Sequence, residues 1–90
     1  MAQYRKKPVV VDAIQWLGTV EDVEPLLTLP RTSNRSSNWK VDGQQLLIHT
    51  LEGTMTAELG DFIVCGVAGE LYPCKPAIFH VTYERITPEE

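Results

Sequence analysis

Short runs of hydrophobic and β-branched residues are separated by turn residues along much of the chain, which is typical of β-strands. β-branched residues are concentrated over positions 5–16, and we expect a strand there. Pro8 should lie near the start of this strand or on a sheet edge, because proline cannot donate a hydrogen bond to a neighbouring strand. The first segment therefore predicts a strand that ends at Trp16, before Gly18.

A short helix is expected over 22–29, where leucines form an apolar stripe and Pro30 ends the pattern. Two residues could cap its start, since Thr19 and Asp22 together resemble a capping box. Asp22 is the better candidate for the N-cap. Counted from Asp22, Pro25 falls in the first turn, where its missing N–H costs nothing.

From Trp39 onward the pattern is one of strands and turns. Asp42 and Gly43 form a strong hairpin dipeptide, with a return strand over 45–50 and another strand over 54–59. The continuous apolar run 62–65 predicts a central strand with both faces covered.

The last third of the chain is less clear. A strand is expected to begin near 70–72, while Pro73 and Pro76 should prevent regular pairing between them. Positions 77–86 fit a strand by composition and a helix by spacing. Together these elements predict a small α+β fold, a single domain over 1–90 built mainly on an antiparallel sheet, with one short helix and either a strand or a helix at the C-terminal end.

Composition narrows the class of protein. The 90 residues are 43% hydrophobic and 22% charged, which is ordinary for a globular domain and argues against disorder. The net charge of −4 makes duplex DNA a poor partner. No apolar stretch approaches the roughly 18 residues that a bilayer requires, and no export signal is recognisable. We therefore expect a cytoplasmic protein in which Cys65 and Cys74 are free thiols.

Metal binding and catalysis receive little support from the sequence. His49, Cys65, Cys74 and His80 are suitable metal ligands by type, but no two of them have the close spacing of a zinc knuckle, and folding would have to bring them together. A Cys74 nucleophile would need His80 and Glu84 nearby, which the spacing does not indicate. We expect no metal, no cofactor and no catalytic residue.

Binding is better supported, because large aromatic and basic residues lie in small groups. Trp and Tyr are common in ligand pockets, and arginine binds phosphates well. Trp16 has the alternative of filling the core, and each basic group has the alternative of a solvated face. The candidate ligand-binding residues are Trp39, Tyr72, Lys75, Arg31 and Arg35, followed by Arg5 and Trp16.

Three segments carry a resemblance to a known group of proteins. The chain opens with YRKKPVVVDAIQW, contains TLEG in its middle, and ends with GDFIVCGVAGELYPCKP followed by TYE. In this order the segments resemble a group of short uncharacterised proteins of tailed phages and prophages. Leu59 replaces a frequent proline of that group, and Cys65 replaces a frequent arginine, which argues against a required cysteine there.

The resemblance implies a phage or prophage origin and action inside a bacterial cell, without implying an activity. Such proteins are often accessory factors that counter host defences. Our leading hypothesis is a homo-oligomer that binds and sequesters a small anionic, nucleotide-like molecule, such as a host immune signal, without turning it over. The first alternative is a protein-interaction module that inhibits a host or phage enzyme through an acidic face (Glu21, Asp22, Glu24, Glu89 and Glu90). The second is an enzyme that degrades a nucleotide signal.

Overall fold

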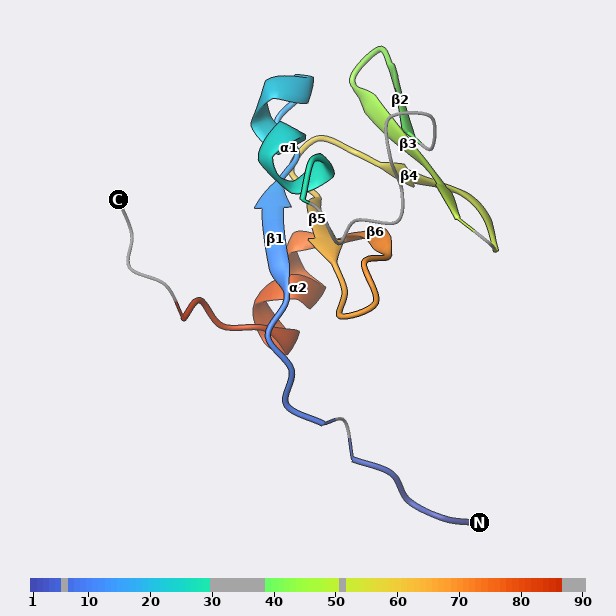
Figure 1. Ribbon diagram of the computed structural model, residues 1–90, viewed down its shortest axis with the longest axis vertical. Coiled ribbons are helices and arrows are strands. Elements are labelled where there is room, and N and C mark those ends of the chain that lie inside the picture. Colours follow the sequence, from blue (N-terminus) through green and yellow to red (C-terminus); the bar gives the residue numbers. More distant parts are fainter. Residues whose placement is uncertain (6, 30–38, 51, 87–90) are drawn as a thin grey trace.

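The structure is a computed structural model of the 90-residue chain and describes residues 1–5, 7–29, 39–50 and 52–86. Over these residues the chain forms two three-stranded antiparallel sheets and two short helices, which confirms the α+β class (Figure 1). The elements in chain order are β1 (Asp12–Gln15), α1 (Val20–Leu27), β2 (Trp39–Asp42), β3 (Gln45–Thr50), β4 (Gly53–Ala57), β5 (Phe62–Cys65), β6 (Leu71–Cys74) and α2 (Pro76–Thr82).

The first sheet has the order β1-β5-β6, with the apolar strand β5 in its centre as predicted. β1 begins at Asp12, which pairs with Cys65, and ends at Gln15, which pairs with Phe62. The prediction of a strand from residue 5 is wrong for its first half. β5 ends at Cys65 and the chain then turns, so residues before Asp12 extend beyond their partner strand.

The second sheet has the order β2-β3-β4 and contains the predicted hairpin. Asp42 pairs with Gln45, so the two-residue loop consists of Gly43 and Gln44 and lies one residue later than predicted. Gly43 has a φ of 63°, a left-handed conformation that glycine adopts without steric cost.

Helix α1 begins at Val20, two residues before the predicted helix, and its N-cap is Thr19 in place of Asp22. The Asp22 carboxylate accepts hydrogen bonds from the Thr19 backbone N–H (3.3 Å) and hydroxyl (3.0 Å). Pro25 consequently lies inside the helix, where it removes one backbone donor. The helix tolerates this because it buries Val23, Leu26 and Leu27 against the sheets.

The C-terminal segment that could be strand or helix is helical in its first half, as α2. Pro76 occupies the first turn, where its fixed φ favours a helix and its missing N–H has no cost. Pro73 pairs with Ile63 and Cys74 pairs with Phe62 within β6, so the expectation that the two prolines prevent regular pairing between them is wrong for Cys74. β6 is an edge strand, and such strands accept proline.

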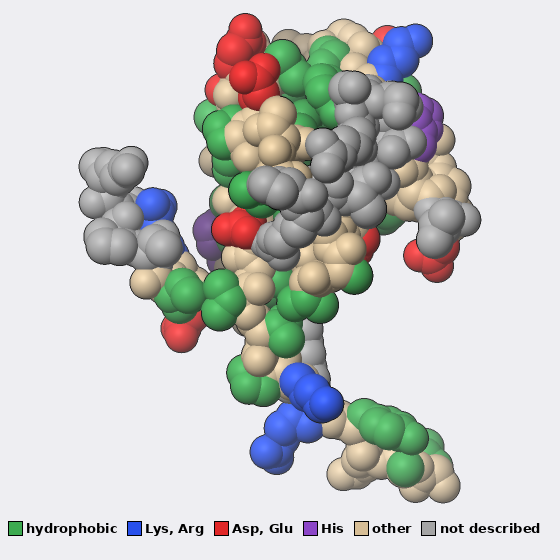
Figure 2. Space-filling model, in the orientation of Figure 1, with side chains coloured by type: hydrophobic (Ala, Val, Ile, Leu, Met, Phe, Trp, Pro, Cys, Tyr) green, Lys and Arg blue, Asp and Glu red, His purple; other side chains and the backbone are tan. Residues whose placement is uncertain are grey.

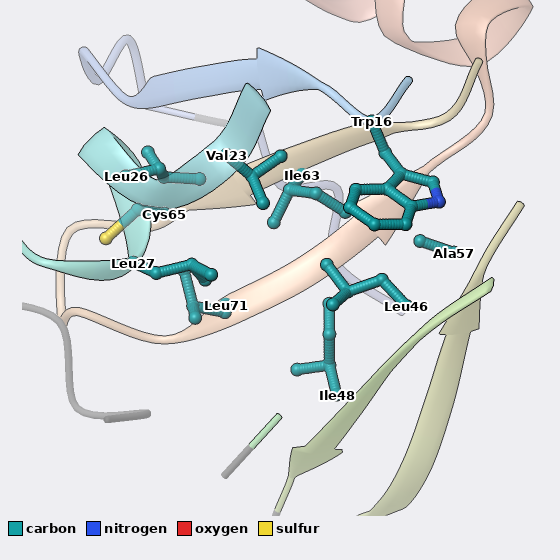
Figure 3. Packing of buried hydrophobic residues seen from close by; sticks show 10 residues of the cluster. All are labelled: Trp16, Val23, Leu26, Leu27, Leu46, Ile48, Ala57, Ile63, Cys65 and Leu71. Carbon is teal, nitrogen blue, oxygen red and sulfur yellow. The ribbon is translucent and has the colours of Figure 1, made fainter. Parts of the chain in front are cut away.

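One cluster of buried side chains joins α1 to both sheets (Figure 3). Trp16 lies between them, beside Ile63 of β5 and above Leu46 and Ala57 of the second sheet. Neither described helix is long and apolar enough for a membrane crossing.

Candidate ligand-binding groove

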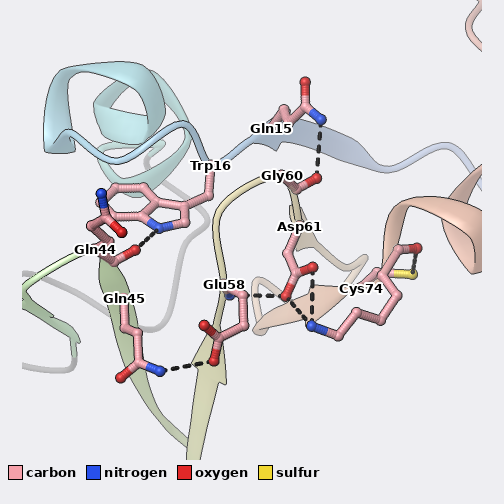
Figure 4. A network of polar contacts seen from close by, with 9 residues as sticks. Gln15, Trp16, Gln44, Gln45, Glu58, Gly60, Asp61 and Cys74 are labelled. Carbon is pink, nitrogen blue, oxygen red and sulfur yellow. Dashed lines mark hydrogen bonds and ion pairs between the residues drawn. The ribbon is translucent and has the colours of Figure 1, made fainter.

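The seven candidate ligand-binding residues do not lie in one place over the part of the chain that the structure describes. Trp16 has no exposed surface, and its Nε1 donates to the Gln44 carbonyl oxygen at 2.8 Å (Figure 4). A ligand could reach this ring only if the core opened. Trp16 is therefore a core residue, and its prediction as a ligand-binding residue is corrected to the alternative that it fills the core.

Lys75 is engaged in an ion pair. Its Nζ lies 2.9 Å from Oδ2 and 3.2 Å from Oδ1 of Asp61, whose side chain is 4% exposed (Figure 4). The same Oδ2 also accepts the backbone N–H of Glu58 at 2.9 Å. A buried carboxylate needs such partners, so a ligand that recruited Lys75 would leave Asp61 with only the backbone donor of Glu58.

Trp39 and Tyr72 are both half-buried. Trp39 packs against the core, and its Nε1 is buried without a hydrogen-bond partner among the described atoms. The Tyr72 hydroxyl lies 3.1 Å from that of Tyr83. Burial, and next the hydrogen bond with Tyr83, raises the pKa of the Tyr72 phenol, which therefore stays neutral at physiological pH.

The predicted arginines lie apart from these residues or outside the description. Arg5 is exposed on the N-terminal segment, which runs away from the two sheets (Figures 1 and 2). Arg31 and Arg35 lie outside the described residues. The expected meeting of these cations with Trp39 and Tyr72 thus stays a prediction.

A different site is formed on the opposite face of the first sheet. A groove of about 1070 Å³ lies between residues 8–15 on one side and α2 with the segment up to Ile86 on the other. Side chains alternate across a strand, so the pairing of Gln15 with Phe62 places both on the same face, away from the core residue Ile63. Helix α2 covers this face without burying any of its own side chains.

Aromatic rings line this groove. The rings of Phe62 and Phe79 are stacked with centroids 4.0 Å apart and planes 4° from parallel. His80 meets both rings edge-on, at 5.3 Å from Phe62 and 5.7 Å from Phe79. Tyr83 lies 5.1 Å from Phe79 and connects the group to Tyr72. We call Phe62, Phe79, His80 and Tyr83 the aromatic cluster; all four line the groove.

The charges on the groove wall are mixed. Asp12, Asp22 and Glu84 contribute carboxylates, and Arg85 contributes a guanidinium. His80 is exposed on the same wall. A single copy of the chain thus supplies rings for stacking but more negative than positive charge at its wall.

Sequence reasoning missed the aromatic cluster, although two signals for it were present. Phe62 opens the apolar run of β5, and Phe79 and Tyr83 are four residues apart, which places them on one face of a helix. The signal was ambiguous because positions 77–86 also fit a strand.

Metal-binding groups can be checked over the described residues. Among them no three His, Cys, Asp or Glu side chains come together in a way that could hold a metal ion. His49 bonds to Thr54 on the second sheet, whereas His80 lies on α2. Cys65 is buried in β5, and Cys74 donates its S–H to the Lys75 carbonyl oxygen at 3.7 Å.

The chain was compared with models of protein families, with curated proteins and with solved structures, and no match was found.

Proposed function

We propose that the chain is a non-enzymatic accessory protein of a phage or prophage, acting in the cytoplasm of the infected bacterial cell. It binds and sequesters a small nucleotide-like molecule, such as a host immune signal. The observation that carries the proposal is the aromatic cluster, which lines an open groove on a face of the first sheet that the core does not use. We therefore propose this groove as the binding site, in place of the dispersed residues that the sequence suggested.

Stacking supplies the main part of the proposed recognition. A nucleobase is flat and binds to the faces or edges of aromatic side chains, which contributes about 1–3 kcal/mol per base. His80 is exposed and Tyr83 half-buried, so both present surface to the groove. The guanidinium of Arg85 on the same wall is a suitable donor to a phosphate.

A protein partner is the second candidate, and a different observation favours it. On α2, Ile78 is 60% and Val81 90% exposed, and neither lines the groove. These two residues are three positions apart and therefore lie on one face of the helix, where they form an apolar surface that another protein could cover. The acidic face named from the sequence receives less support, since the Asp22 carboxylate is hydrogen-bonded to Thr19 and residues 89 and 90 lie outside the description.

Two substitutions on α2 separate these candidates. Phe79→Leu removes the ring that stacks on Phe62, and Ile78→Ser changes an exposed neighbour outside the groove. Isothermal titration against cyclic dinucleotides and ADP-ribose derivatives should give saturable heat with the native chain and with Ile78→Ser. Phe79→Leu should weaken binding roughly tenfold or more, because a stacking surface is lost.

Three results contradict the proposal of a nucleotide ligand. The first is an absence of heat with every nucleotide tested against folded protein. The second is an equal loss of affinity in both variants. The third is a chemically altered ligand, detected by mass spectrometry after the protein is denatured, because sequestration returns the molecule intact.

A further inference from the structure

Gln15 is the one amide side chain among the described residues that line the aromatic groove. It is the last residue of β1 and pairs with Phe62, whose ring belongs to the aromatic cluster. Directly opposed residues of neighbouring strands have their Cβ atoms about 4.5–5.5 Å apart, so the amide lies beside the rings of this cluster. The groove therefore holds a hydrogen-bonding group next to its stacking surface.

The orientation of this amide is determined by a backbone contact. Gln15 Nε2 donates to the Gly60 carbonyl oxygen at 3.0 Å. A carbonyl oxygen can only accept, so the amide nitrogen, and not the amide oxygen, must face Gly60. Gly60 is itself held in place, because its N–H donates to the Trp16 carbonyl oxygen at 2.8 Å and its φ of 91° suits glycine. The amide of Gln15 cannot turn over without losing the bond to Gly60.

The remaining hydrogen-bonding groups of the amide are directed away from Gly60. A glutamine amide carries two N–H donors and one oxygen acceptor, and the bond to Gly60 uses one N–H. Oε1 of Gln15 accepts no hydrogen bond from the described residues. In Figure 4 the bond to Gly60 leaves the amide on the side opposite to Oε1, so Oε1 and the second N–H share the outer edge of the amide. This edge presents an acceptor and a donor side by side, in a fixed order.

We propose that Gln15 recognises the base of the bound nucleotide and selects adenine. Adenine presents an amino donor beside a ring-nitrogen acceptor on both of its hydrogen-bonding edges, and this pair complements the oxygen and the N–H of a glutamine amide. The N7 edge of guanine presents two acceptors and would leave Oε1 of Gln15 facing an oxygen. The inference rests on the proposed function, since it names the base of the nucleotide that the groove binds.

Two nucleotides that differ only in the 6-amino group test this selectivity: AMP and purine riboside 5′-monophosphate. Dissociation constants from NMR titration of the native chain should favour AMP about tenfold, because the amino group is the donor that Oε1 of Gln15 accepts. GMP should also bind more weakly than AMP. In Gln15→Met, which keeps the size of the side chain and removes the amide, the constants for AMP and purine riboside 5′-monophosphate should differ less than about threefold.

Gln44→Met is the matched control, because Gln44 is exposed in the loop between β2 and β3 and the substitution leaves its backbone carbonyl in place. This variant should keep the native preference for AMP. If Gln15 served only to hold Gly60, Gln15→Met would weaken the binding of both nucleotides by the same factor and leave their ratio unchanged.

Three results would overturn the inference while leaving the proposed function intact. The first is equal binding of AMP and purine riboside 5′-monophosphate to the native chain. The second is a GMP complex as tight as that of AMP, and the third is a Gln15→Met variant that keeps the native preference. The comparison of ligands on the native chain decides even if Gln15→Met does not fold. If no nucleotide binds, the proposed function fails together with this inference.

Discussion

The two faces of the first sheet differ in how their side chains are covered. One face packs Ile63, Cys65 and Leu71 against α1 and the second sheet in a closed core with Trp16 at its centre. The other face is covered by α2, which buries none of its own side chains and leaves an aromatic groove open. The same strands thus stabilise the fold on one side and present rings to the surroundings on the other. Because Trp16 belongs to the closed face, a tryptophan by itself is a poor guide to a binding site.

The largest effect is expected from Trp16→Ala on the core face. Removing a fully buried indole leaves a cavity and the unpaired Gln44 carbonyl, which should lower the free energy of unfolding by about 3–5 kcal/mol. Val81→Ala on the α2 face should change it by less than about 0.5 kcal/mol, because that side chain is exposed. Urea denaturation measures both, and similar losses would contradict the distinction between the faces.

An intermediate effect is expected from Lys75→Ala. The variant leaves the buried Asp61 carboxylate without its cationic partner. Since Lys75 itself is more than half exposed, we expect a loss of about 1–2 kcal/mol, below the cost of breaking a fully buried pair. Lys40→Ala, at an exposed position of β2, is the matched control. If the two variants were equally stable in thermal denaturation, the ion pair between Lys75 and Asp61 would contribute nothing to the stability of the fold.

A smaller effect with a defined pH dependence is expected at Tyr72. The pKa of this phenol is raised in the folded chain above the ordinary value of 10.0, so the unfolded chain ionises first. Its contribution to stability is complete below pH 10 and decreases as the pH rises beyond it.

Tyr72→Phe should therefore reduce the loss of stability above pH 10. At neutral pH it should cost about 1 kcal/mol, because the hydrogen bond to Tyr83 is lost. Tyr4→Phe, at a 94% exposed position, should leave the pH profile unchanged. If stability depended on pH in the same way in the native chain and in Tyr72→Phe, the raised pKa of Tyr72 would be refuted.

Local sequence signals predicted much of the fold. Gly43 marks the hairpin and the apolar run of β5 marks the central strand, because both features depend on residues close together in the chain. The N-cap of α1 was misassigned because Pro25 was expected to avoid the helix interior. Burial of the leucines outweighs the loss of one backbone donor there.

The binding residues could not be predicted in the same way. The ion pair of Lys75 with Asp61 joins residues 14 positions apart, and the bond from Trp16 to Gln44 joins residues 28 apart. Neither contact leaves a local pattern in the sequence. The aromatic cluster likewise forms only when α2 packs on β5, two segments whose separate patterns show no relation to each other.

Chemical-shift mapping by ¹H–¹⁵N NMR during titration with a cyclic dinucleotide or an ADP-ribose derivative tests the central claim most directly. We expect the perturbed amides to cluster at Ala13–Gln15 in β1 and at Phe79–Arg85, around the groove. Shifts confined to Trp39 and the neighbouring segment 31–38, with the amides of α2 unchanged, would contradict the assignment of the binding site to this face.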